Sequence, residues 1–117
     1  MDKKWAEAIE LLESALKRET KDQDRALTFA ARAKAFEVAF EYTWKCFKRA
    51  ADQAGLEVYS PRDAIKAAAQ MKLIADLEKW QQFLNARNLS VHDYIGIEDD
   101  SFAKLIAEFL AEARRLK

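Results

Sequence analysis

The sequence predicts an all-α protein, an up-and-down helical bundle of four main helices plus a short extra helix. Helix-forming residues dominate the composition, and the 117 residues include only two glycines and one proline, too few for the turns of a β fold. Apolar residues recur at spacings of three and four along most of the chain, which is the helical period. Because this length supports one hydrophobic core, we expect a single domain over residues 1–117.

The first two expected helices are defined by their apolar spacing. Residues 2–18 carry apolar side chains at spacings of four, three and four (Trp5, Ile9, Leu12 and Leu16). A polar stretch over 19–24 ends this pattern, and a long second helix is expected from there to Gly55, which suits the position just after a helix. One side of the second helix is strongly aromatic and is interpreted as the seam of the core: Phe29, Ala33, Phe36, Phe40, Trp44 and Phe47.

The remaining helices are indicated by their starting residues. Ser60 is an expected N-cap, and Pro61 takes the first helical position, where its missing N–H costs nothing. This third, short helix is expected to extend to about Ile74. Asp76 can cap a fourth helix, which bears Trp80, Phe83 and Leu84 and leads into residues 87–94. After a break at residues 96–101, a last helix is expected over 102–116.

Charge and segment composition exclude several classes of protein. Twenty basic residues balance twenty acidic ones, so no overall field would draw the chain to nucleic acid or to an anionic membrane. No apolar run approaches a membrane span, and no apolar signal core follows the first residues. A lone cysteine, Cys46, cannot form an internal disulfide, which fits a reducing compartment. A cytoplasmic protein without membrane contact is therefore expected.

Few of the usual catalytic sets can be assembled from this chain. With one histidine, His92, and one cysteine, a conventional zinc site is disfavoured, and neither a metal nor a cofactor is expected. No glycine-rich phosphate loop is present in the sequence. A nucleophile pair of Cys46 and His92 can be considered, but Cys46 falls in mid-helix, where a lone thiol is more commonly a small buried hydrophobe.

Polar side chains gather near the end of the fourth helix, within residues 87–94: Arg87, Asn88, Ser90, His92 and Tyr94. Arginine can bind phosphate through two N–H groups, and histidine, with a reference pKa of about 6.5, can move protons near neutral pH. Together they would suffice for metal-free cleavage of RNA through its 2′-hydroxyl. The alternative is structural: Arg87 and Asn88 would cap neighbouring helix ends, and His92 would be a satisfied, partly buried residue.

Helical geometry sets a condition on this cluster. At about 100° per residue, positions 88 and 92 lie one turn apart on one face, whereas positions 87 and 92 lie about 140° apart. Either the helix ends or distorts between Asn88 and His92, or a two-fold related subunit completes the site. On the second helix, Glu37, Glu41 and Lys45 form a stripe at spacings of four. We interpret it as a solvated face with a weak Glu41–Lys45 pair worth about 0.2 to 0.5 kcal/mol.

The order of these motifs resembles the HEPN superfamily, whose signature is an arginine, a polar residue and a histidine after four to six intervening positions. Arg87, Asn88 and His92 fit this signature with four. More narrowly, the chain resembles the HEPN proteins encoded beside minimal nucleotidyltransferases, called nucleotidyltransferase substrate-binding proteins. Besides the signature with Tyr94, the segments similar to that group are Phe36–Glu37, Phe40–Glu41, Trp44–Lys45, Ser60–Pro61–Arg62 and Trp80.

The resemblance implies a bundle that dimerises through its signature-bearing helices and pairs with a small nucleotidyltransferase. In related toxin–antitoxin pairs the HEPN member cleaves RNA, and the nucleotidyltransferase neutralises it by adding AMP to a tyrosine two positions after the histidine, here Tyr94. Arg87 and His92 are then the expected catalytic residues, and Asn88, Lys45 and Ser90 the expected substrate-binding ones. Two alternatives stay open: a non-catalytic subunit that binds a nucleotide or other substrate for the nucleotidyltransferase, and a purely structural helical dimer.

Overall fold

Five α-helices make up most of the part of the chain that the computed structural model describes: α1 (Lys3–Lys17), α2 (Arg25–Gln53), α3 (Pro61–Gln70), α4 (Leu77–His92) and α5 (Asp99–Ala113), with one 3₁₀ turn, η1 (Asp22–Asp24). The structure describes residues 1–18, 22–92 and 99–116, and within them every side chain except those of residues 22, 91, 92 and 99. None of these residues is in a strand, so the prediction of an all-α helical bundle is confirmed. No helix in these ranges combines the length and apolar character needed to cross a bilayer.

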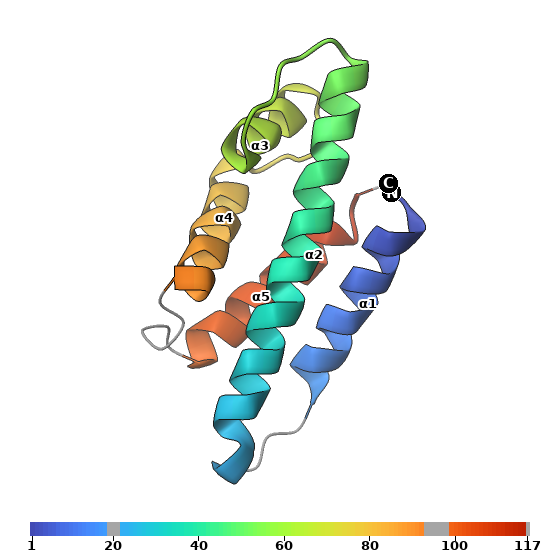
Figure 1. The fold of residues 1–117 in the computed structure, drawn as a ribbon. Coiled ribbons are helices and arrows are strands. Elements are labelled where there is room, and N and C mark those ends of the chain that lie inside the picture. Colours follow the sequence, from blue (N-terminus) through green and yellow to red (C-terminus); the bar gives the residue numbers. More distant parts are fainter. Residues whose placement is uncertain (19–21, 93–98, 117) are drawn as a thin grey trace.

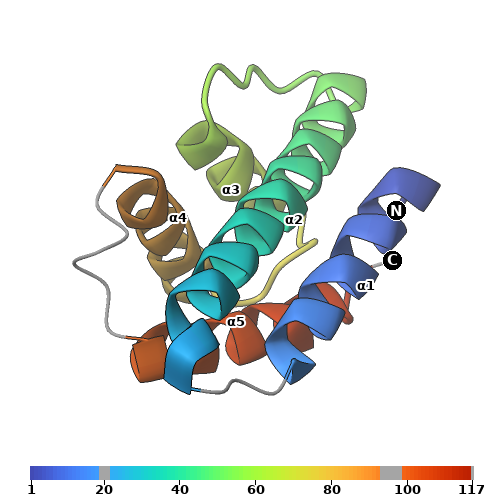
Figure 2. The ribbon, with the colours of Figure 1, turned by 60° about the horizontal axis from the view of Figure 1, so that its bottom comes forward.

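The long helix α2 is the centre of the bundle. Helix α1 runs antiparallel along one side of it, α3 and α4 lie along the other, and α5 crosses behind it obliquely (Figures 1 and 2). The two ends of the chain lie close together beside α1 (Figure 1). The face of α2 that is turned to the viewer in both figures is not covered by any helix of the described chain. We call it the open face of α2.

The core is built from the aromatic seam of α2 and the rings that α4 and α5 bring to it. Phe36, Phe40 and Phe47 are fully buried, as the sequence predicted. Phe109 of α5 packs against Phe36, with ring centroids 5.3 Å apart, and against Trp80 of α4 at 5.7 Å. Edge-to-face pairs of this kind add about 0.5 to 1.5 kcal/mol each beyond the buried area. Three helices therefore share one aromatic core, which fixes how α4 crosses α2.

The predicted starts of α1, α3 and α4 are confirmed by capping hydrogen bonds. The Asp2 carboxylate accepts the backbone N–H of Trp5 at 2.8 Å, and the Ser60 hydroxyl accepts that of Asp63 at 3.1 Å. Asp76 caps α4 by accepting the N–H of Lys79 at 3.0 Å. Each bond satisfies one of the N–H groups that a helix start leaves without a partner.

Three predicted boundaries are wrong. Helix α3 ends at Gln70 rather than about Ile74, because the chain turns at Lys72, whose φ of 62° lies in the left-handed region. The N–H of Leu73 then donates to the carbonyl of Ala68 at 2.9 Å, which closes the helix in the manner usual for glycine. Helix α5 spans Asp99–Ala113 rather than 102–116. It begins earlier than predicted, and it ends earlier because the N–H groups of Arg115 and Leu116 bond three residues back instead of four.

Candidate functional site

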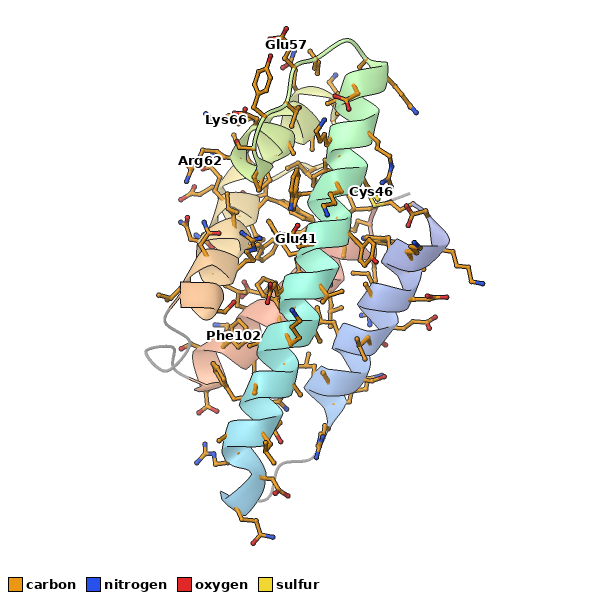
Figure 3. The ribbon with its side chains drawn as sticks, viewed as in Figure 1. Glu41, Cys46, Glu57, Arg62, Lys66 and Phe102 are labelled. Carbon is orange, nitrogen blue, oxygen red and sulfur yellow. The ribbon has the colours of Figure 1, made fainter. Side chains whose placement is uncertain are left out.

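Arg87 is tied to the centre of the molecule by an ion pair that links α4 to α2. Its guanidinium donates from Nη2 to the Glu41 carboxylate, across 46 residues of sequence. The two side chains are 24% and 26% exposed, so the pair is partly shielded from water but still reachable from solution. Figure 3 labels Glu41 about midway along α2, the part of the helix that α4 approaches. The expected phosphate-binding cation is thus a held side chain and not a free one.

Glu41 is the centre of this arrangement, and sequence reasoning did not include it among the candidate site residues. Besides Arg87, its carboxylate accepts the indole N–H of Trp44 at 3.1 Å. The Lys45 ammonium lies 3.9 Å from the same oxygen, Oε2. The stripe of Glu37, Glu41 and Lys45 was interpreted as a solvated face with a weak Glu41–Lys45 pair. That pair is present, but Glu41 is only partly exposed because Arg87 of α4 is bonded to its carboxylate. The only signal was its place in the Phe40–Glu41 segment that resembles the family pattern.

Arg87 keeps hydrogen-bonding capacity after it has bound Glu41. Its Nη1 donates to the Oδ1 of Asn88 at 3.0 Å. Its Nε–H is buried and has no partner in the described part of the chain. A guanidinium has five N–H groups in a rigid plane, and the two bonds use two of them. Glu41 and Asn88 therefore orient Arg87 through its two terminal nitrogens, whereas its Nε–H is closed to solvent.

The other expected substrate-binding residues differ in their surroundings. Lys45 is 56% exposed and borders a shallow depression of about 280 Å³ that also includes Glu41 and Tyr42. Ser90 is buried, and its hydroxyl donates to the backbone carbonyl of Arg87 at 2.9 Å. Around Glu41 the structure thus brings together Arg87, Asn88 and Lys45. The Ser90 hydroxyl is instead bonded within its own helix, so its expected role stays a prediction.

The backbone of α4 runs without a break from Leu77 through His92. The helix end or distortion that would bring positions 87 and 92 together is therefore absent between Asn88 and His92. Positions 87 and 92 of a continuous helix are about 140° apart around its axis. The side chain of His92 and all of Tyr94 lie outside what the structure describes. One copy of α4 does not direct the two expected catalytic positions to one face.

Cys46 does not have the surroundings of a nucleophile. It lies on α2 beside the start of α1 (Figure 3), where its Sγ accepts from the Arg49 guanidinium at 3.1 Å and lies 4.0 Å from the Asp2 carboxylate. Burial raises the pKa of the thiol, which disfavours the thiolate that nucleophilic chemistry needs. The expectation of a buried hydrophobe is also wrong, because the side chain is partly exposed at the edge of a cavity of about 510 Å³.

No metal-binding set can be assembled from the side chains that the structure describes, since no three histidine, cysteine or carboxylate groups gather in them.

The sequence of the whole chain decides the family. A family model described as "Nucleotidyltransferase substrate binding protein like" matches residues 3–117. The chain belongs to this family. The nucleotidyltransferase substrate-binding proteins are a HEPN-like group, so the resemblance stated from the motifs is confirmed. No curated protein matches the chain. The name of the family implies association with a nucleotidyltransferase.

Proposed function

We propose that this chain is the HEPN-type partner of a minimal nucleotidyltransferase in a two-component, toxin–antitoxin-like system, and that its homodimer is a metal-independent RNA endonuclease. The observation that carries the proposal is the oriented Arg87, which Glu41 and Asn88 hold through one N–H of each terminal nitrogen while its side chain stays partly exposed. An arginine held in this way is suited to bind a phosphodiester and to stabilise the charge that develops on it. Family membership supports the nucleotidyltransferase as the partner.

The proposed site is shared between two protomers. Since the continuous α4 separates positions 87 and 92, a dimer formed through the signature-bearing helices would place Arg87 of one copy near His92 of the other. Arg87 would bind the phosphate, with Asn88, Lys45 and Ser90 as further substrate ligands. The RNA 2′-oxygen would attack the phosphorus, and the bond to the 5′-oxygen would break. His92 would accept the 2′-hydroxyl proton and deliver it to the leaving 5′-oxygen, leaving a cyclic phosphate and a 5′-hydroxyl.

Control of this site is proposed to act through Tyr94. The nucleotidyltransferase would transfer AMP from ATP to the phenol oxygen and release pyrophosphate. An added adenylate carries negative charge, and close to the signature it would compete with RNA phosphate for Arg87. The proposed setting is the cytoplasm, where RNA and ATP are both present.

RNA incubated with the purified protein in EDTA tests the nuclease. Wild type is expected to cleave, and both Arg87→Ala and His92→Ala are expected to lose cleavage. Lys66→Ala, an exposed cation on the outer side of α3 (Figure 3), is the matched control and should retain it. If the folded wild-type protein leaves every RNA intact, the nuclease proposal is wrong.

A second candidate is a binding subunit without catalysis, which presents a nucleotide to the nucleotidyltransferase. The Glu41–Arg87 pair favours it, because a carboxylate already neutralises the signature cation. In that case wild type should bind a nucleotide or RNA without cleaving it, and Arg87→Ala should abolish the binding. Isothermal titration with ATP and with a short RNA separates this outcome from the first.

Intact-mass measurement tests the proposed modification. After co-expression with the nucleotidyltransferase encoded beside it, wild type should gain adenylate mass and Tyr94→Phe should not. Tyr59→Phe is the control, because Tyr59 is 81% exposed on the α2–α3 loop and should leave the modification unchanged. An unmodified wild type would remove the adenylylation claim and leave the nuclease claim standing.

A further inference from the structure

A second surface feature lies on the open face of α2, in the groove that this helix forms with α1. The groove has a volume of about 390 Å³, and its lining is mostly apolar (Leu11, Ala15, Ala31, Ala35 and Val38). Leu11 is 56% exposed, and Leu27, one turn before Ala31 on the same stripe of α2, is 66% exposed. Exposed leucines next to a groove are typical of surfaces that another molecule covers.

The groove is continuous with the candidate site. Lys34 and Val38 line both the groove and the depression that contains Glu41. From there Glu41 reaches Arg87 of α4 through its ion pair. No described helix lies over this stretch of α2 in either view of the fold (Figures 1 and 2). A molecule seated in the groove would therefore extend directly toward the signature arginine.

The charge at the groove indicates what kind of molecule would fit. Of the described residues that line it, the charged ones are Arg18 and Lys34, both cations. Lys34 is 72% exposed and approaches the Glu37 carboxylate only to 3.7 Å, a weak pair that leaves its charge available. No acidic side chain lines the groove among the described residues, so its charge is of one sign. Acidic side chains at the edge of a partner would complement these cations.

We propose that the α1–α2 groove is the docking surface for the nucleotidyltransferase, which would insert an apolar helical segment edged by aspartate or glutamate. A groove between two helices suits an amphipathic helix, whose apolar face fills it while its charged edges meet the rim. This inference rests on the proposed partnership and names the surface that carries it. The docked partner would then lie beside the Glu41–Arg87 pair, in reach of the same end of α4 that bears the signature.

Titration calorimetry with the purified nucleotidyltransferase encoded beside this chain tests the proposal. Leu11→Ser and Lys34→Glu are each expected to weaken binding tenfold or more, as substitutions at the centre of an interface do. The matched controls are Leu73→Ser, a leucine 41% exposed that lines a different cavity, and Lys66→Glu on α3. Both controls should bind within twofold of wild type. Thermal unfolding of each variant confirms that the exposed substitutions leave the fold intact.

The possible outcomes separate this proposal from the proposed function. If wild type binds the nucleotidyltransferase and Leu11→Ser and Lys34→Glu bind equally well, the groove is not the docking surface, while the partnership stands. If wild type does not bind it at all, the partnership and the docking proposal both fail. If Leu11→Ser converts a dimer to a monomer in sedimentation, the groove is an interface between copies and the proposal is overturned. RNA cleavage by Leu11→Ser alone should equal that of wild type.

Discussion

At the scale of the residue, two acceptors hold Arg87: the Glu41 carboxylate and the Oδ1 of Asn88. The signature placed Arg87 and Asn88 at the site, and the structure shows them hydrogen-bonded to each other. Glu41 could not be found in the same way. Its partner is 46 residues away, and the pair depends on where α4 crosses α2, which helical periodicity does not reveal. The same periodicity correctly left Lys45 on an exposed stripe.

Replacing the Glu41 carboxylate tests its structural role. Glu41→Gln should lower the free energy of unfolding by about 1 to 2 kcal/mol, because a partly buried guanidinium loses a charged acceptor. Glu37→Gln on the same stripe should cost less than about 0.5 kcal/mol, since its ion pair with Lys34 is long and largely exposed to solvent. Urea unfolding of both variants provides the comparison.

A double variant shows whether this loss belongs to the pair. Glu41→Gln combined with Arg87→Met should lose less stability than the sum of the two single changes, because both remove one interaction. Additive losses would mean that Glu41 acts through Trp44 or Lys45 instead of Arg87.

At the scale of the element, the starts of α1, α3 and α4 were predicted better than the ends of α3 and α5. A start is set by a side chain that bonds a backbone N–H three residues on, as Asp2, Ser60 and Asp76 do, so it can be read locally. An end depends on a left-handed residue. Gly55, with φ of 78°, indicated the end of α2 because glycine is the usual residue there, whereas a lysine at position 72 did not indicate the end of α3.

The left-handed residue at the end of α3 predicts that glycine has opposite effects on stability at two lysines, Lys72 and Lys66. Lys72→Gly should stabilise the protein by about 1 kcal/mol, because glycine adopts a positive φ without the steric penalty of a side chain. Lys66→Gly, in the exposed middle of α3, should destabilise it by about 1 kcal/mol through lost helix propensity. Thermal or urea unfolding measures both. Equal effects of the two substitutions would contradict the left-handed conformation at Lys72.

At the scale of the whole molecule, α4 is an unbroken helix through positions 87 and 92. The sequence predicted that a straight helix cannot bring positions 87 and 92 together, and the continuous backbone supports the proposed shared site. How two copies would meet in the proposed dimer could not be predicted, because an interface depends on the shape of a whole surface and not on the period of one helix.

Subunit mixing tests the shared site directly. Arg87→Ala and His92→Ala proteins, each inactive alone, should recover about a quarter of wild-type RNA cleavage when co-refolded in equal amounts. Half of the dimers are then mixed, and each mixed dimer has one complete site of two. A variant carrying both substitutions, mixed with wild type, controls for the exchange. If the subunits are shown to exchange and RNA cleavage does not recover, the two residues belong to a site within one chain, and the shared site is wrong.

The position of Cys46 has a practical consequence for finding the faces that meet. It is the only cysteine of the sequence, and it lies partly exposed on α2, beside the start of α1. A spin label attached there would give one probe per protomer, so a symmetric dimer would yield a single interspin distance. Because burial raises the pKa of this thiol, labelling should proceed best in mildly alkaline buffer. In the proposed dimer, this one label would therefore measure the distance between the two copies of α2, the helix whose open face carries Glu41.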